Sequence, residues 1–315
     1  MKRILVTGGA GLIGSHLCGR LLSKGHKVIC VDNLITGDKK NINSLLQSPN
    51  FKFIEFDITK DISTLNSLPR RQAGQLSTLN YIYHLACPTG VPNLVTLAEE
   101  MLLTCSIGTR NVLELARKTK AKLIFVSSSE VYGDPEIFPQ SEEYTGNVDP
   151  IGIRSPYEEG KRFAESLVMM YVRKYNVDAR IVRVFNTYGQ CVLDKDSRVI
   201  PKFLRQIKTS EPLTVEGRGE QTRTFCYVDD LVDGLILVLN KGLAGEVYNI
   251  GSDREIRIID LAKLMIKITK SKSKIKFVKR PTHDHKRRLP DLAKIKKLGW
   301  RSNIDLKIGI LKTIQ

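Results

Sequence analysis

The chain has 315 residues, of which 42% are hydrophobic and 26% charged, as in an ordinary soluble globular protein. This length suits one large domain, or a nucleotide-binding domain with a smaller companion. No segment approaches the ~20 consecutive apolar residues that span a bilayer, which argues against a membrane protein or membrane partner. Because Met1–Arg3 runs directly into a strand-like segment, we expect no signal peptide and a cytoplasmic location.

The formal net charge is +17, and residues 241–315 hold 20 Lys and Arg against seven Asp and Glu. Lysines recur at helical and then at strand spacing between residues 263 and 276, which is typical of a solvated face. This region has no interleaved aromatic platform and no known nucleic-acid motif, so we expect no nucleic-acid partner. An anionic small-molecule substrate explains the sign of the charge equally well.

Short apolar strands alternate with amphipathic helices over the first 190 residues. The clearest predicted strands are Ile4–Thr7, Lys27–Val31, Phe51–Phe56, Tyr81–Leu85, Lys122–Ser127 and Asp178–Val184, with helices at Ser15–Lys24, Thr109–Lys118 and Glu158–Lys174. This alternation predicts an α/β fold of the Rossmann type, a doubly wound parallel sheet with helices on both faces.

From about residue 186 the pattern is less regular, with a strand at Pro212–Glu216 and helices at Asp229–Leu239 and Ile259–Ile268. We therefore divide the chain into a Rossmann domain at 1–185 and, at 186–315, mainly a smaller substrate-binding lobe. Some segments of the second part are expected to return to the first domain. Residues 60–80 are predicted to form a surface connection.

A glycine-rich turn follows the first strand and opens the first helix. Gly8, Gly11 and Gly14 lack side chains where a backbone must turn tightly, approach a pyrophosphate and pack helix on strand. The helix N-terminus offers N–H groups to the phosphates. Asp32 closes the second strand 18 residues after Gly14, where a carboxylate accepts hydrogen bonds from a ribose diol and repels a 2′-phosphate. The turn therefore predicts NAD binding rather than NADP binding.

Tyr157 and Lys161 are four residues apart at the start of a helix, so both lie on one face. A free phenol, with a pKa near 10, is a poor base at neutral pH, but an adjacent ammonium and a nicotinamide cation lower this pKa. The serines 127–129 end a buried strand, where they can supply a hydroxyl that orients a substrate alcohol. Together with the glycine turn, this group predicts an enzyme.

The six cysteines are scattered, and no two have the two-residue spacing of a metal or redox pair. Most lie in apolar segments, where cysteine behaves as a small hydrophobic residue. We expect no metal site.

Several long segments resemble one family. They are Ser127–Glu136, Gly146–Ser155, Tyr157–Arg162, Arg183–Gly189, Glu211–Val215, Gln221–Val228 and Lys286–Asp291. On these segments the chain resembles extended short-chain dehydrogenases/reductases that act on nucleotide sugars, and most closely the UDP-glucuronate decarboxylases (UDP-xylose synthases). The resemblance runs nearly end to end.

The resemblance implies a carboxy-lyase that converts UDP-glucuronate to UDP-xylose through a 4-keto intermediate, with NAD regenerated in the site. Tyr157, assisted by Ser128 and Lys161, would remove the proton of the sugar 4-hydroxyl. Glu130 and Arg288 match positions implicated in decarboxylation and reprotonation. Simpler roles stay open for both: Glu130 as a helix cap and Arg288 as a phosphate ligand.

The same resemblance implies the binding residues and a homodimer. The NAD contacts would be Gly8, Gly11, Leu12, Ile13, Gly14, Asp32, Asn33, Gly37, Asp57, Ile58, Leu85, Ala86, Tyr157 and Lys161, and the UDP-sugar contacts Asn186, Thr214, Val215, Arg223 and Arg288. Arginine suits a diphosphate because its fork offers paired donors. Relatives pair through two helices each, here the one near Thr109–Lys118 and the one after Tyr157.

The sequence departs from the family pattern at a few positions. Serine stands at 128 where threonine is usual, Cys105 replaces an asparagine, and residues 87–93 do not reproduce the family's Pro-Ala-Ser-Pro run and following tyrosine. Ser129 stands where a 4,6-dehydratase carries its aspartate, which argues against that reaction. A nucleotide-sugar 4-epimerase of the UDP-glucose or UDP-glucuronate type stays an alternative. A catalytically silent NAD-binding regulator is an alternative of another class, although it predicts loss of the tyrosine or lysine.

Overall fold

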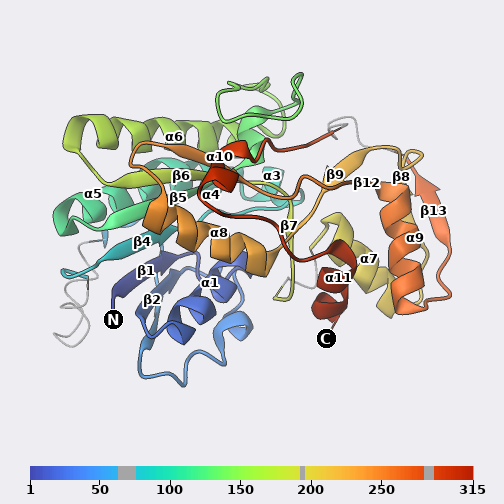
Figure 1. The fold of residues 1–315 in the computed structure, drawn as a ribbon, viewed down its shortest axis with the longest axis horizontal. Coiled ribbons are helices and arrows are strands. Elements are labelled where there is room, and N and C mark those ends of the chain that lie inside the picture. The colour runs from blue at the N-terminus through green and yellow to red at the C-terminus, as the bar shows by residue number, and fades with distance from the viewer. Residues whose placement is uncertain (63–75, 192–195, 280–286, 315) are drawn as a thin grey trace.

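The computed structural model describes residues 1–62, 76–191, 196–279 and 287–314 (Figure 1). At its centre lies a seven-stranded parallel sheet with the strand order β11-β6-β5-β4-β1-β2-β3. The strands are β1 (Arg3–Thr7), β2 (Lys27–Asp32), β3 (Phe51–Glu55), β4 (Tyr81–His84), β5 (Lys122–Ser128), β6 (Ala179–Val184) and β11 (Val247–Ile250). The predicted doubly wound α/β fold is confirmed.

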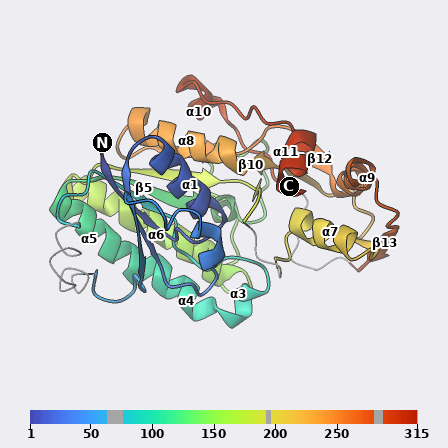
Figure 2. The same ribbon diagram turned by 90° about the horizontal axis from the view of Figure 1, so that it is seen from below.

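Helices cover both faces of this sheet, as Figure 2 shows from below. One layer contains α1 (Leu12–Ser23) and α8 (Val228–Lys241), and the other contains α4 (Ala98–Leu103), α5 (Thr109–Thr119) and α6 (Ser155–Tyr175). Apolar runs such as Leu123–Val126 are buried because both sides of the strand are covered. Two hydrophobic cores result, one on each side of the sheet.

The predicted strands and helices of the first 190 residues are all present, with small differences at their ends. Helix α1 begins at Leu12, three residues earlier than expected, because the glycine turn leads directly into it. Helix α6 begins at Ser155 because Pro156 lies in its first turn, where the missing N–H has no intrahelical partner to lose. The sequence analysis missed β11, and the expected connection at 60–80 lies largely outside the described residues.

A smaller lobe lies beside the sheet, at the right of Figure 1. Its main elements are α7 (Val199–Lys208), β8 (Leu213–Glu216), β9 (Thr222–Thr224), β12 (Glu255–Arg257), α9 (Ile258–Thr269) and β13 (Ile275–Val278). Strand β8 pairs with β13 in parallel, and β9 pairs with β12 in antiparallel orientation. The chain returns to the large sheet through α8 and β11, while the domain boundary at 185/186 stays a prediction.

Shorter elements complete the described chain. They are η1 (Lys39–Ile42), α3 (Asn93–Thr96), η3 (Thr104–Gly108), η4 (Ser129–Tyr132), β7 (Thr187–Tyr188), β10 (Cys226–Tyr227), α10 (Ala293–Lys297) and α11 (Leu306–Ile314). Of these, η3 is a single π-helical turn that joins α4 to α5. Such turns widen a helix locally and are frequent at functional sites.

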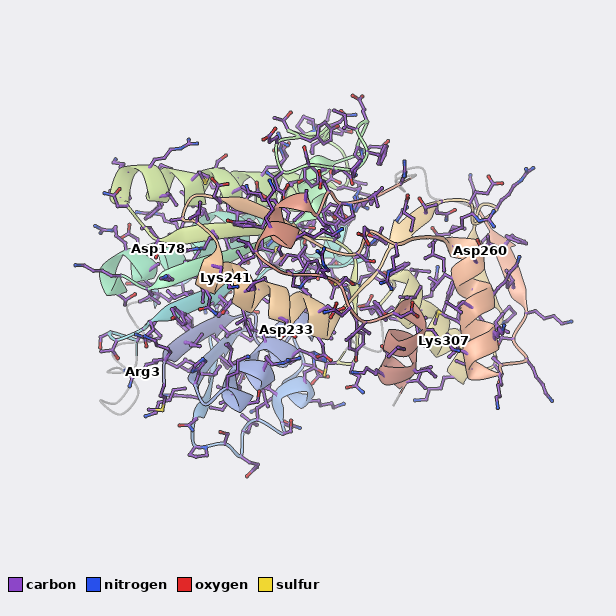
Figure 3. All side chains as sticks on the ribbon, in the orientation of Figure 1. Arg3, Asp178, Asp233, Lys241, Asp260 and Lys307 are labelled. Atoms are coloured by element: carbon purple, nitrogen blue, oxygen red, sulfur yellow. The ribbon has the colours of Figure 1, made fainter. Side chains whose placement is uncertain are left out.

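The lysine-rich segment forms an exposed face, as its spacing predicts. The lysines at 263, 267, 270, 272, 274 and 276 are all exposed. Figure 3 shows side chains of α9 and β13 extending outward at this edge of the molecule, with Asp260 labelled among them. Within the described ranges, no helix is both long and apolar enough to cross a membrane.

Candidate active site

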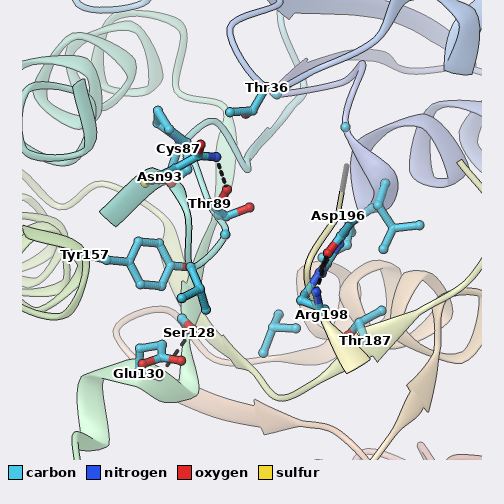
Figure 4. A pocket seen from close by; sticks show the side chains of 18 of the residues that line it. Thr36, Cys87, Thr89, Asn93, Ser128, Glu130, Tyr157, Thr187, Asp196 and Arg198 are labelled. Carbon is cyan, nitrogen blue, oxygen red and sulfur yellow. Dashed lines mark hydrogen bonds and ion pairs between the residues drawn. The ribbon is translucent and has the colours of Figure 1, made fainter. Parts of the chain in front are cut away.

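A cavity of about 740 Å³ opens at the carboxyl ends of the central strands, and residues from the sheet and the smaller lobe both line it. Ligands bind at this edge in open parallel sheets. With one exception, every predicted site residue lines the cavity, although these residues come from segments up to 280 positions apart. Figure 4 shows Tyr157, Ser128 and Glu130 on one side, facing Asp196 and Arg198 across the opening.

The exception is Val215, whose side chain faces the core, so that its predicted contact with the substrate stays a prediction for its backbone. Thr214 and Val215 are neighbours on β8, and successive strand side chains point to opposite faces. Thr214 lines the cavity and bonds with Gln206, whose side chain donates to its hydroxyl at 3.0 Å. Val215 instead lies fully buried in the hydrophobic core.

The glycine turn has the form of a phosphate cradle. Gly8 has a φ of +72°, and a Cβ atom there would lie 2.7 Å from the backbone nitrogen of Ala86. At Gly14 a Cβ would lie 2.1 Å from the Gly8 carbonyl oxygen, so only glycine allows α1 to approach the turn. At Gly11 a Cβ would approach no atom more closely than 3.5 Å, and this residue lines the cavity. The Gly11 position thus leaves open the space that a ligand phosphate needs.

Asp32 is fixed at the end of β2 by backbone groups. The N–H groups of Ala10 and Leu34 each donate to its carboxylate at 2.9 Å. Burial raises the pKa of Asp32, while these two N–H donors oppose the rise. A Cβ at Gly37 would lie 2.8 Å from the carboxylate, so glycine is needed there as well. The turn and Asp32 therefore fit the pyrophosphate and ribose of NAD.

Tyr157 and Lys161 lie on adjacent turns at the start of α6. Lys161 is 3% exposed, and its Nζ donates to the carbonyl of Val126 at 2.9 Å. Burial lowers the pKa of Lys161, but the surrounding thiols, Tyr157 and Glu165 raise it by more, which keeps the side chain an ammonium. This hydrogen bond and charge fix the ammonium on the helix face that carries the phenol.

The pKa of Tyr157 differs from the expectation. Burial raises it to about 12, although Lys161 and the Ser128 hydroxyl both act to lower it. The predicted direction of the lysine's effect is therefore confirmed, but desolvation outweighs it. Further positive charge in the cavity, such as the nicotinamide ring, would act in the same direction as Lys161.

Ser128 ends β5 and caps the short helix η4. Its Oγ accepts a hydrogen bond from the backbone N–H of Glu130 at 3.2 Å. The helix cap is thus the serine, so Glu130 does not have the simpler role considered above. The Glu130 side chain instead contacts arginines.

The Glu130 carboxylate lies between two arginines. Its Oε1 is 2.5 Å from Nη1 of Arg288, and its Oε2 is 2.5 Å from Nη2 of Arg154. Arg154 also bonds with Glu158 at 3.0 Å. Burial alone would raise the pKa of Glu130, but the two guanidinium groups hold it well below its usual range. Glu130 is therefore ionised at neutral pH.

Gln140 holds the segment that carries Arg288. Its backbone and side-chain groups make 2.8 Å hydrogen bonds with the backbone of Leu289 and Asp291. Arg288 itself is buried at the cavity wall, and only its Nη1 bonds with Glu130. Its Nε and Nη2 are buried without a hydrogen-bond partner among the described residues. Donors of this kind are costly to leave unpaired, so they indicate a place for an acceptor from a ligand.

Sequence reasoning missed Arg154 as a site residue. Its spacing to Glu158 is the i,i+4 spacing of a helical ion pair, which was visible in the sequence. It also missed Arg198, which lines the opposite wall and pairs with Asp196 at 2.5 Å. No local pattern pointed to Arg198, because only the tertiary fold brings it to the cavity.

The remaining predicted substrate residues lie at the side of the cavity formed by the smaller lobe. Asn186 lines it and donates through Nδ2 to the carbonyl of Thr224 at 3.3 Å. Arg223 on β9 lines it as well and donates to the carbonyl of Thr222 at 2.8 Å. No group of three or more His, Cys, Asp and Glu side chains that could hold a metal ion occurs among the described residues. The expectation of no metal stays a prediction.

One edge of the sheet carries the glycine cradle, the anchored carboxylate of Asp32 and the Tyr157–Lys161 pair. Together these features define a class of enzymes that depend on a dinucleotide. Residues 4–251 match the NAD dependent epimerase/dehydratase family, and the chain belongs to it. Its predicted dependence on NAD is therefore confirmed at the level of the family.

Relatives with similar sequences include UDP-glucuronic acid decarboxylases. The chain is 42% identical to UDP-glucuronic acid decarboxylase 1 of Danio rerio, with all of this chain and 72% of the relative aligned. It is also 42% identical to UDP-glucuronic acid decarboxylase 4 of Arabidopsis thaliana, over 98% of this chain and 67% of the relative. The resemblance stated from the sequence is confirmed.

Solved structures with the same fold include two epimerases. A UDP-glucose 4-epimerase from Thermotoga maritima aligns with a TM-score of 0.88 and 30% identity, over 99% of this chain and 97% of the other. A UDP-glucuronic acid 4-epimerase from Bacillus cereus, in complex with UDP-glucuronic acid and NAD, aligns with a TM-score of 0.86 and 29% identity, over the same shares.

Proposed function

We propose that this protein is an NAD-dependent carboxy-lyase that converts UDP-glucuronate to UDP-xylose. The observation that carries the proposal is Arg288, which lines the cavity together with Tyr157 and Ser128 and has two buried nitrogens, Nε and Nη2, without a hydrogen-bond partner among the described residues. A sugar with a carboxylate supplies acceptors for such donors, whereas a neutral hexose supplies weaker ones. The 42% identity to UDP-glucuronic acid decarboxylases supports the same substrate.

Tyr157 is the base for the first step. Its phenolate takes the proton of the sugar 4-hydroxyl, and the fixed ammonium of Lys161 stabilises that phenolate. The Ser128 hydroxyl orients the alcohol from the end of β5. The glycine turn and Asp32 would hold NAD, which would supply a hydride acceptor for C4 that is regenerated within the site, so that the reaction involves no net oxidation.

The second step uses the chemistry of the sugar. A 4-ketone lies β to the carboxylate, so the bond to the carboxyl carbon breaks, carbon dioxide leaves, and the electron pair moves to the ketone oxygen as an enolate. Arg288, anchored by the ionised Glu130, orients the carboxylate before it leaves. Protonation at C5 then restores the ketone for its reduction.

We further propose that Asn186, Thr214 and Arg223 hold the UDP group at the other side of the cavity. All three line it, and the Arg223 guanidinium provides paired donors for a diphosphate. Arg198 and Lys202 also line the cavity, where Arg198 is paired with Asp196 at 2.5 Å and Lys202 with Glu216 at 3.4 Å.

We infer that two copies pair through the helical layer of α4 to α6. Large hydrophobic side chains are exposed there, namely Leu102, Leu103, Ile107, Phe163 and Met170. An apolar surface of this kind supports a homodimer. A cytoplasmic location is supported by the six cysteines, all of which are free thiols, as in reducing compartments.

The test is an assay of the purified protein with NAD and UDP-glucuronate labelled with ¹³C at the carboxyl group. We expect labelled carbon dioxide and UDP-xylose, identified by NMR. UDP-galacturonate that keeps the label would instead establish the 4-epimerase. Bound NAD without any turnover would favour the silent regulator, and either result would contradict the proposal.

A further inference from the structure

Two cysteines that are 18 residues apart meet beside the catalytic pair. Cys87 follows β4 and lines the cavity, as Figure 4 shows, and Cys105 lies in the π-helical turn η3 and is 2% exposed. Their Sγ atoms are 3.6 Å apart, and either can donate the hydrogen bond. This distance exceeds the roughly 2.05 Å of a disulfide, so the pair is a dithiol.

The surroundings favour a shared negative charge on this dithiol. The hydrogen bond with Cys87 and, to a smaller extent, the ammonium of Lys161 lower the pKa of Cys105 to about 7, against the effect of burial. The same hydrogen bond and burial raise the pKa of Cys87. These two shifts place most of the charge on Cys105; because either sulfur can act as donor, transfer of the remaining proton to Cys105 leaves a smaller share of thiolate on Cys87, which lines the cavity. A thiolate is the reactive form of cysteine.

We propose that Cys87 and Cys105 form an oxidisable dithiol whose disulfide, made by a peroxide, switches the catalytic site off. The Cys87 thiolate attacks one peroxide oxygen, the O–O bond breaks, and hydroxide leaves and is protonated to water. The sulfur of Cys105 then attacks the sulfenic acid on Cys87, its proton and the hydroxyl leave as a second water, and the S–S bond forms. Two thiols are oxidised while one peroxide is reduced to two waters.

The disulfide would act on the site through two contacts. Cys87 follows Leu85 and Ala86, which line the NAD side of the cavity. Cys105 packs against α6, since a Cβ built at Gly160 would lie 3.4 Å from its Sγ. Drawing the sulfurs together therefore moves the loop after β4 relative to the helix that carries Tyr157. Misplacing a catalytic group by about 1 Å can reduce its rate by about 100-fold.

A second pair of cysteines provides a comparison within the same chain. Cys18 and Cys30 also share a hydrogen bond, but both are fully buried in the core beneath Gly9. Burial raises the pKa of Cys18 well above its usual value. A small oxidant in the cavity reaches Cys87 but not this pair, so the two pairs should respond differently.

The first test is peptide mapping without reducing agent. The full chain is treated with hydrogen peroxide, alkylated with iodoacetamide and digested. We expect one peptide pair linked through Cys87 and Cys105, lighter by two hydrogens than the separate thiols, while Cys18 and Cys30 remain alkylatable after unfolding. Absence of this link, or oxidation to sulfinic acid alone, would overturn the proposal.

The second test measures function and rests on the proposed activity. We expect peroxide to lower carbon dioxide release by about tenfold or more and to weaken NAD binding, with both restored by dithiothreitol. Cys87→Ser, on a half-buried loop, should lose this response, as should Cys105→Ser if it folds. Cys191→Ser, at another cysteine that lines the cavity, is the matched control and should keep it.

The outcomes separate the two proposals. A linked protein with unchanged turnover and unchanged NAD affinity would overturn the switch. A reduced protein that releases no carbon dioxide would contradict the proposed function alone. The peptide map and the NAD affinity do not depend on that activity, so they still test whether the disulfide forms and whether it changes the site.

Discussion

Two buried clusters of arginine and glutamate lie near the ends of β5 and β6, and they differ in how fully the arginine is bonded. Arg183 donates from Nε and Nη2 to the two carboxylate oxygens of Glu165, at 3.0 and 2.7 Å. Its Nη1 donates to the Tyr132 hydroxyl and to the Glu142 carbonyl, both at 3.0 Å. In the other cluster Arg288 bonds with Glu130 through Nη1, and its Nε and Nη2 have no partner among the described residues.

This difference in hydrogen bonding indicates that Arg183 contributes to the stability of the fold and Arg288 to the binding of a ligand. A buried cation with all its nitrogens bonded is used entirely by the protein, and its contacts join β6 to α6. A buried cation with unpaired donors has lost its hydration without gaining hydrogen bonds in return. A ligand that accepts hydrogen bonds from those donors can offset this cost. We therefore assign the Arg183 cluster to the fold and the Arg288 cluster to the substrate.

The largest expected effect tests whether the reaction takes place in the cavity that Arg288 lines, where Tyr157 is the proposed base. Tyr157→Phe removes the phenolic oxygen and should reduce carbon dioxide release by about 10⁴-fold, since it removes the general base. NAD affinity, measured by the quenching of protein fluorescence, should stay within about threefold, because the glycine turn and Asp32 are untouched. Full residual activity would refute the role of Tyr157.

The next effect concerns the fully bonded cluster. Arg183→Lys keeps the charge but cannot reproduce the paired bonds to Glu165, so we expect the free energy of unfolding to fall by about 3 kcal/mol. The rate constant kcat of the folded enzyme should change by less than about threefold, because Arg183 lies outside the cavity wall. Denaturant unfolding and steady-state kinetics measure the two quantities. A large loss of kcat with an unchanged free energy of unfolding would contradict the assignment of the Arg183 cluster to the fold.

The same substitution at the other arginine should give the opposite pattern. Arg288→Lys retains a cation for Glu130 but removes the free Nε and Nη2 donors, so kcat/KM should fall by about 30-fold. The free energy of unfolding should change by about 1 kcal/mol or less, because those donors bond with no described residue. Arg287→Lys is the matched control, since this exposed neighbour pairs with Glu255 at 2.6 Å and should keep its activity.

The smallest effect is a pH dependence of stability. The pKa of Glu130 is lowered in the folded protein, so its stabilising contribution is complete above its unfolded pKa of about 4.3 and is lost as the pH falls through the lower folded value. The difference in unfolding free energy between the original chain and Glu130→Gln should stay constant from pH 7 to 5. Below about 4.3 it should shrink by up to about 1.4 kcal/mol per pH unit.

The control for this measurement is Glu99→Gln at an exposed position, which should change stability by less than about 0.5 kcal/mol throughout. A difference for Glu130→Gln that grows on acidification would show that the carboxyl group is not held ionised by its arginines.

Local spacing decided which parts of the site could be predicted. The glycine turn, Asp32 and the Tyr157–Lys161 pair each depend on neighbouring residues and on the ends of strands, and all line the cavity. Arg288 lies 158 residues from Glu130, and only the family resemblance brought the two together. The roles assigned to these residues remain predictions.

Other features needed the tertiary structure. The dithiol joins a loop to a π-helical turn, and neither segment has a spacing that predicts contact with the other. The buried orientation of the Val215 side chain was not predicted, because a resemblance between segments does not say which face of a strand a side chain occupies. In the fold, β11 was missed because its four residues are too few to show a period.

The position of β11 has a consequence for how the protein is synthesised. This strand covers the open edge of β6, yet it follows α7, β8 and β9 of the smaller lobe in the chain. Until residue 250 has left the ribosome, the largely buried strand Ala179–Val184 therefore has unpaired backbone groups along one side. The nascent chain is exposed to edge-to-edge association during this interval, and a translational pause before β11 would prolong it.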